Sequence, residues 1–257
     1  MPMSDSEQSK DHSALGAIRT QIEAFRSELP SLAQLSRDIT QRVGSPLIDW
    51  VDSLHLVAEA RRRTKWIDLG WLPADKGRDH EVLRFAGEEL PPIVLHRGLT
   101  ARLDLRVEQL DTFLKAHGLV FNACIEGQAG SALRRAQWKS TGLRAFGIVE
   151  RHGCASFDPR VSACNDPKKL AQWRQRISDR PRSVADESES MAELGELLKK
   201  ACSDLGQGPA TDLFLACERE YWQGRNVAAR MQYRRQQGLG LGWGNYGKHV
   251  YLSLIHI

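Results

Sequence analysis

The pattern of apolar and polar positions divides the chain into helical and strand-rich stretches. Apolar residues three and four positions apart indicate amphipathic helices. These stripes predict helices at residues 14–29, 31–43 and about 46–63, which together form a helical unit over residues 14–65. Pro30 and Gly44 stand where the first two helices should end. The polar start, residues 1–13, is expected to be disordered.

From Trp66 onward, glycine and proline recur and short apolar runs replace the helical stripes. The runs at 81–85, 92–96 and 102–107 predict strands, and a helix is expected at 108–117. Two further runs, 133–139 and 142–151, meet at a Ser-Thr corner and predict a hairpin. Residues 78–158 are therefore predicted to form a small α+β domain with an antiparallel sheet.

Helical patterns return over residues 165–238, where the periodicity predicts helices at 166–177, 191–205 and 209–237. No internal repeat is evident at the periods typical of solenoids. The predicted fold class is α+β. It has a helical N-terminal unit, the small antiparallel domain, a helical segment, and the start of a truncated C-terminal domain at 239–251.

The last six residues, Leu252 to Ile257, read as a translated sequencing adaptor. Their sequence, LSLIHI, is what a transposase-based library adaptor encodes in frame. We therefore expect the native sequence to stop at about Tyr251, and we exclude His256 as a ligand.

Composition narrows the class of protein. The chain has 257 residues, of which 41% are hydrophobic and 26% charged, as is usual for a soluble globular protein. Its net charge of +4 is mild and spread over the chain, so a concentrated nucleic-acid-binding face is not expected. No apolar run is long enough for a transmembrane helix, and the start lacks a signal-peptide pattern.

The five cysteines indicate a reducing compartment. They are odd in number, widely spaced and without a C-x-x-C pair, which disfavours a disulfide framework or a zinc ribbon. We therefore expect free thiols and a cytoplasmic location. The cysteines are Cys124, Cys154, Cys164, Cys202 and Cys217.

The most unusual local feature is the glycine-rich run from Gly238 to Tyr251. So many glycines are poorly suited to a plain strand, and they indicate positive φ or close backbone approach. One interpretation is a connector between a helix and the next domain. Another is the kinase glycine-rich loop, G-x-G-x-Y-G-x-V-Y, which residues 242–251 resemble with one extra residue before Val250. A dinucleotide-binding loop is disfavoured because the run follows a helix.

A third interpretation rests on the segment EYWQGRN at 220–226, followed by LGLGWGN at 239–245 and a histidine-bearing strand. Together these resemble a junction in uncharacterised bacterial proteins that leads into a module similar to the vicinal-oxygen-chelate metalloenzymes. That family opens its module with a strand bearing a metal-binding histidine, and His249 matches this position. The resemblance implies a divalent metal as cofactor, with further ligands beyond Tyr251.

Two smaller groupings are weaker candidates for chemistry. His152 and Cys154 flank a glycine and suggest a nucleophile with its base, although neighbours two apart on an extended chain need not meet. Glu218 and Glu220 lie two apart on a helix and do not face each other, so we interpret them as surface charges or partners of Arg225.

A basic stretch within the helix at 209–237 carries a binding hypothesis. Its arginines, with Trp222 and Tyr233 among them, suit phosphate contacts and base stacking, although a solvated helix face is the preferred interpretation. The arginines are Arg225, Arg230, Arg234 and Arg235. The sequence thus leaves two main hypotheses: the N-terminal part of a vicinal-oxygen-chelate metal enzyme with His249 as a ligand, or a non-enzymatic module that binds a partner or nucleic acid.

Overall fold

The computed structural model has an α+β fold, as the sequence predicts, with helices and a mixed sheet. It describes residues 5–77, 79–86, 90–120, 123–128, 131–138, 142–153, 157, 166–180, 187–225 and 227–241. The chain divides into two compact units. Unit 1 comprises Met1–Cys124, Ala136–Val149 and Leu239–Ile257, and unit 2 comprises Ile125–Arg135 and Glu150–Gly238.

The strands form one mixed sheet in the order β2-β3-β4-β1-β5-β8-β7-β6. β1 pairs in parallel with β4 and antiparallel with β5, while β3 pairs antiparallel with both β2 and β4. The strands are β1 Val51–Val57, β2 Trp71–Lys76, β3 His80–Phe85, β4 Ile93–His96, β5 Ala101–Val107, β6 Cys124–Glu126, β7 Leu133–Gln137 and β8 Arg144–Arg151.

The order of elements contains a repeat. β1, helix α3 (Ala60–Asp68), β2, β3 and β4 are followed by β5, helix α4 (Leu110–Ala116), β6, β7 and β8. In each set the last strand lies beside the first, and the two first strands, β1 and β5, meet in the middle of the sheet. The fold is therefore a pair of strand–helix–strand–strand–strand repeats joined through β1 and β5.

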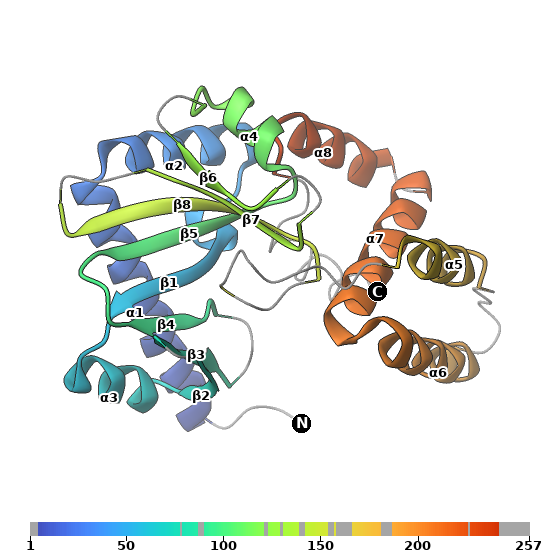
Figure 1. Cartoon of the computed structure of the whole chain (residues 1–257), viewed down its shortest axis with the longest axis horizontal. Coiled ribbons are helices and arrows are strands. Elements are labelled where there is room, and N and C mark those ends of the chain that lie inside the picture. The colour runs from blue at the N-terminus through green and yellow to red at the C-terminus, as the bar shows by residue number, and fades with distance from the viewer. Residues whose placement is uncertain are drawn as a thin grey trace. The chain divides into compact units, whose positions relative to one another are not determined.

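The central strands bury apolar side chains on one face. Leu54 of β1 lies opposite Leu103 of β5, and both belong to the main hydrophobic core with Leu56 and Leu105. Helices α1 (Asp5–Glu28) and α2 (Pro30–Val43) cover this face (Figure 1) and contribute fully buried side chains to the same core. Because strand side chains alternate, the residues between these leucines point to the opposite face.

One predicted helix is wrong. The stretch 46–63 forms a short 3₁₀ helix, η1 (Leu47–Trp50), then β1 and the start of α3. The apolar residues of this stretch fit a helical stripe, which is why the sequence predicted a helix. In the structure β1 is central in the sheet and almost all of its residues are buried, so the alternation of apolar and polar residues that marks a strand is weak. Helix α1 begins at Asp5 and so covers most of the stretch for which the sequence predicted disorder.

Other predicted elements are confirmed. Strands β3, β4 and β5 and helix α4 lie at the expected places, and β7 and β8 are neighbours in the sheet. Helix α2 starts at Pro30 and ends at Gly44, which adopts φ 79° and donates its amide to the carbonyl of Thr40. The sheet was expected to be antiparallel, but β4 pairs in parallel with β1, which the sequence predicted to be part of a helix.

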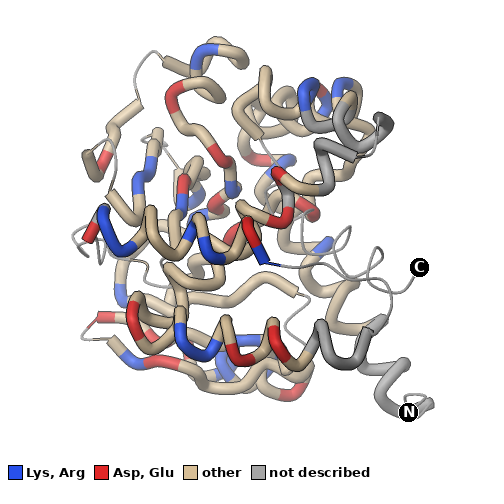
Figure 2. Tube along the Cα trace, turned by 90° about the vertical axis from the view of Figure 1, so that its right-hand side faces the viewer, with Lys and Arg blue, Asp and Glu red and all other residues tan. Residues whose placement is uncertain are grey.

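The helices of unit 2 are α5 (Pro167–Ser178), α6 (Glu187–Leu205), α7 (Gln207–Arg225) and α8 (Val227–Gly238). Asp166 caps α5 by accepting from the amides of Lys168 and Lys169. Where the sequence predicted a single helix at 209–237, the structure has two, α7 and α8. Basic and acidic residues are interleaved along the described part of the trace (Figure 2), and the net charge is only +4. Among the described residues, none of the helices has the length and apolar character to cross a membrane.

Candidate functional site on the polar face of the central strands

A buried polar cluster lies on the face of β1 and β5 that α1 and α2 do not cover. Ser53 of β1 pairs with Asp104 of β5, and His55 pairs with Arg102, on either side of the Leu54–Leu103 pair. Ser53 and Asp104 have at most 1% of their surface exposed, and His55 has 5%. Rotating this strand pair by 180° about an axis through the Leu54–Leu103 pair, perpendicular to the sheet, would superpose His55 on Asp104 and Ser53 on Arg102. The two repeats therefore contribute equivalent positions with different chemistry.

An irregularity in β1 adds a second carboxylate to this cluster. The register between β1 and β5 shifts between Val51 and Ser53, which is a β-bulge. Bulges re-aim side chains and occur often beside active sites. Asp52 lies in the bulge, and its Oδ2 accepts a hydrogen bond of 3.1 Å from the Ser53 hydroxyl.

The ring of His55 contacts a hydroxyl, a carboxylate and a guanidinium. Its Nε2 lies 3.1 Å from both Ser53 Oγ and Asp104 Oδ2. Arg102 Nη2 lies 3.3 Å from Nδ1 and 3.2 Å from Nε2. Since the Ser53 hydroxyl donates to Asp52, the Ser53 oxygen and Asp104 Oδ2 can both accept from a proton on Nε2. A nucleophilic triad would need serine and aspartate on different ring nitrogens, so this cluster does not form one.

Asp104 is held as a carboxylate. Burial would raise its pKa, but the charges of Arg102 and His55 and the hydrogen bonds from both outweigh burial and hold the pKa well below its ordinary value. Arg102 donates from Nε to Oδ1 at 2.7 Å and from Nη2 to Oδ2 at 3.0 Å. Gly147 of β8 makes room for this carboxylate, because a Cβ there would overlap Asp104 Oδ1.

His96, at the end of β4, lies beside the cluster. Its ring centroid is 6.3 Å from that of His55, and its Nδ1 accepts the amide of Gly98 at 3.0 Å. Burial, Arg102 and His80 lower the pKa of His96, so the ring is neutral near pH 7. With Nδ1 accepting, the remaining proton sits on Nε2, and His96 offers an N–H donor.

The described residues do not fit a metal ion at this place. His55 and Asp104 are suitable ligand types, but the guanidinium of Arg102 contacts both of them and already supplies the positive charge. The neighbouring positions are Val94, opposite His55 on β4, and Gly147, and neither has a side-chain atom that could coordinate a metal. Among the described residues, no group of three or more His, Cys, Asp or Glu side chains is arranged to hold a metal ion.

Most candidates from the sequence lie elsewhere. His249, the kinase-like loop at 242–251 and the adaptor-like end at 252–257 lie outside the described residues, as do Cys154 and Cys164, so those interpretations stay predictions. His152 Nε2 lies 3.1 Å from Glu150 Oε1. Glu220 pairs with Arg174 at 2.8 Å and Glu218 with Arg180 at 2.5 Å. Glu218 is only 3% exposed, so its interpretation as a surface charge is wrong.

The start of the glycine-rich run has a structural role. Gly240 adopts φ 72°, and a Cβ there would overlap the backbone of Phe113 in α4. Its carbonyl accepts the amides of Glu108 and Gln109 at 3.1 and 3.0 Å. The positive φ and close backbone approach predicted for this run are confirmed at Gly240.

Sequence reasoning missed the buried cluster, although a signal was present. Both strands carry an alternation of polar residues and leucines, SLHL at 53–56 and RLDL at 102–105. In each, the leucines reach the main core and the polar residues share the other face. Polar residues alternating with leucines in a strand that proves to be central indicate a buried polar site.

Comparison of the chain with protein-family models, with curated proteins and with solved structures finds no match.

Proposed function

We propose that the protein is an enzyme of the vicinal-oxygen-chelate kind in which Arg102 takes the place of the metal at the centre of the sheet. The sequence resemblance concerns the segment that leads to His249, outside the described residues, and so does not extend to this site. Within the described residues, β1 opens the first repeat and carries His55, and β5 opens the second and carries Asp104 at the equivalent position. The observation that carries the proposal is the guanidinium that contacts both residues.

The ligand class follows from the donors. A guanidinium is a permanently charged donor that hydrogen-bonds strongly to anionic oxygens. Among the described residues, the hydrogen bonds of Arg102 to Asp104 and His55 use Nε and Nη2, so Nη1 is available to a ligand. His96 adds a neutral N–H donor on the same face. The substrate class we propose is a small 2-oxo carboxylate, whose oxygens stand on adjacent carbons.

The chemistry follows from where negative charge would collect. The base we assign is Asp52, the carboxylate of the cluster that accepts from Ser53. When Asp52 takes the proton from the carbon beside the carbonyl, the C–H bonding pair forms a C=C bond and negative charge moves onto the carbonyl oxygen. Fixed donors directed at that oxygen stabilise the transition state more than the substrate. Arg102 and His96 supply such donors, and a neutral imidazole is a suitable electrophile for an enolate oxygen. Asp104 holds the guanidinium in place, which makes Asp104 a positioning residue.

The test is titration calorimetry of the full chain, pretreated with a chelator, against oxalate as a stable mimic of two vicinal oxygens. Arg102→Gln alone would leave a buried carboxylate, so the test variant is Arg102→Gln with Asp104→Asn. Loss of a charge-assisted hydrogen bond, about 1.5–3 kcal/mol, should weaken binding roughly ten- to a hundredfold. Arg61→Gln, which removes an exposed arginine on α3, away from the polar cluster, is the matched control and should bind as the unmodified protein does.

Unchanged oxalate affinity in the folded double variant would overturn the proposal, and so would the absence of binding at millimolar oxalate. A dependence of binding on added divalent metal would instead favour a metal centre. Circular dichroism melts of each variant establish that it is folded.

A further inference from the structure

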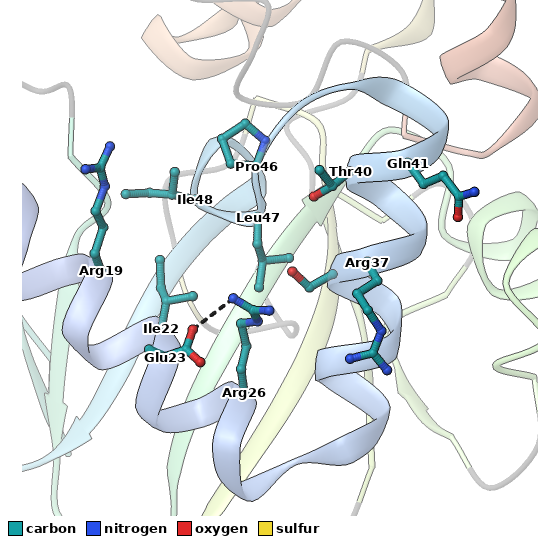
Figure 3. A pocket seen from close by; sticks show the side chains of 11 residues that line it. Arg19, Ile22, Glu23, Arg26, Arg37, Thr40, Gln41, Pro46, Leu47 and Ile48 are labelled. Atoms are coloured by element: carbon teal, nitrogen blue, oxygen red, sulfur yellow. Dashed lines mark hydrogen bonds and ion pairs between the residues drawn. The ribbon is translucent and has the colours of Figure 1, made fainter.

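A groove of about 790 Å³ lies between α1, α2 and η1 within unit 1 (Figure 3). Its volume is within the range of small-molecule sites, roughly 300–1,000 Å³. It lies on the helix-covered side of the sheet, whereas the polar cluster lies on the other face. The lining residues are Arg19, Ile22, Glu23, Arg26, Ser36, Arg37, Thr40, Gln41, Pro46, Leu47 and Ile48.

The groove has an apolar floor. Ile22 of α1 and Leu47 of η1 are nearly buried, at 6% and 4% exposure, and belong to the main core. Ile48 packs against that core from the rim. An apolar chain lying on this floor would cover side chains that now face the groove, which is favourable in proportion to the area removed from water.

The sides of the groove are basic. Three arginines line it against a single glutamate. Glu23 accepts one hydrogen bond from Arg26 Nη1 at 2.8 Å. Figure 3 shows the Arg26 guanidinium inside the groove near Leu47, with Arg19 and Arg37 to either side. Arg26 Nε is buried and, among the described residues, has no hydrogen-bond partner. A buried donor without an acceptor is costly, so Arg26 is incompletely hydrogen-bonded, and an anionic oxygen bound to its guanidinium in the groove would add a charge-assisted hydrogen bond.

We propose that this groove binds a medium-chain fatty carboxylate, with the carboxylate on Arg26 and the chain on Ile22, Leu47 and Ile48. An apolar floor with a cationic wall is complementary to an amphiphilic anion. A purely polar anion would leave the floor in water, and a neutral alcohol would leave the arginine excess unmatched. The site is independent of the proposed oxalate site.

The experiment is calorimetry of the full chain with hexanoate, octanoate, decanoate and decanol, each below its micelle concentration. Each added methylene should tighten binding about fourfold, as expected for burial of one CH₂. Decanol should bind at least tenfold more weakly than decanoate. Arg26→Gln should weaken decanoate at least tenfold, whereas Arg61→Gln, an exposed arginine on α3, should have no effect.

Ile48→Ser should reduce the dependence on chain length without removing the preference for the anion. The double variant Arg102→Gln with Asp104→Asn should bind decanoate normally, which separates this proposal from that for the sheet face. Equal affinity for decanol and decanoate would overturn the proposal. So would full affinity in a folded Arg26→Gln protein, or no binding of decanoate at millimolar concentration.

Discussion

Replacing Gly147 by alanine should strain the centre of the sheet. A Cβ at this position would overlap Asp104 Oδ1 and lie 3.4 Å from the carbonyl oxygen of Ala136. The carboxylate cannot move freely, because Arg102 holds both of its oxygens. Overpacking of this kind costs about 1–3 kcal/mol. For a chain of this length that corresponds to a melting temperature lower by about 2–4 °C per kcal/mol.

Thermal unfolding followed by circular dichroism measures this effect, and Gly195→Ala is the matched control. Gly195 lies within α6, and a Cβ there meets nothing within 4 Å, so alanine should stabilise the protein by about 0.5–1 kcal/mol. Removing the carboxylate by Asp104→Ser should make Gly147→Ala less costly, with a coupling of about 1 kcal/mol or more. An equal cost of Gly147→Ala in both backgrounds would refute the reasoning.

Two further predictions concern buried charges. The pKa of Asp104 is held below its ordinary value, so its contribution to stability is present above about pH 4 and is lost as the pH falls further, because the unfolded chain binds the proton first. Urea unfolding at pH 5, 4 and 3 should show a weaker pH dependence in Asp104→Asn, and identical pH dependence would contradict this. Arg180→Ala should destabilise the protein by about 1–3 kcal/mol, since it removes a partner of the buried Glu218 carboxylate. Lys199→Ala, which breaks an exposed pair with Glu196, is its control and should leave the urea midpoint unchanged.

The sequence predicted correctly those elements whose apolar spacing fits either a helix or a strand but not both. The alternation of Leu103 and Leu105 indicated a strand with one buried face, and β5 is that strand. The residues of β1 fit a helical stripe and a fully buried strand equally well, and only pairing with β4 and β5 decides between them.

The candidate site was missed for a related reason. Its members come from strands separated in sequence by α3 and the β2–β3–β4 meander, so no local motif contains them. The repeat itself is equally hidden, because the equivalent positions carry His55 in one half and Asp104 in the other. Only the pairing register brings this equivalence into view.

The contact of Gly240 with α4 has a consequence for the order of assembly. Unit 1 is interrupted by Glu150–Gly238, and the chain returns to it at Leu239. The Gly240 carbonyl then accepts the amides just before α4, and Leu241 enters the main core with no exposed surface. During synthesis the sheet and its first helices leave the ribosome well before these residues do. The core of the nascent chain therefore lacks Leu241 and the backbone of Gly240 that lies against Phe113. Unit 1 is completed only after the residues of unit 2 have been made.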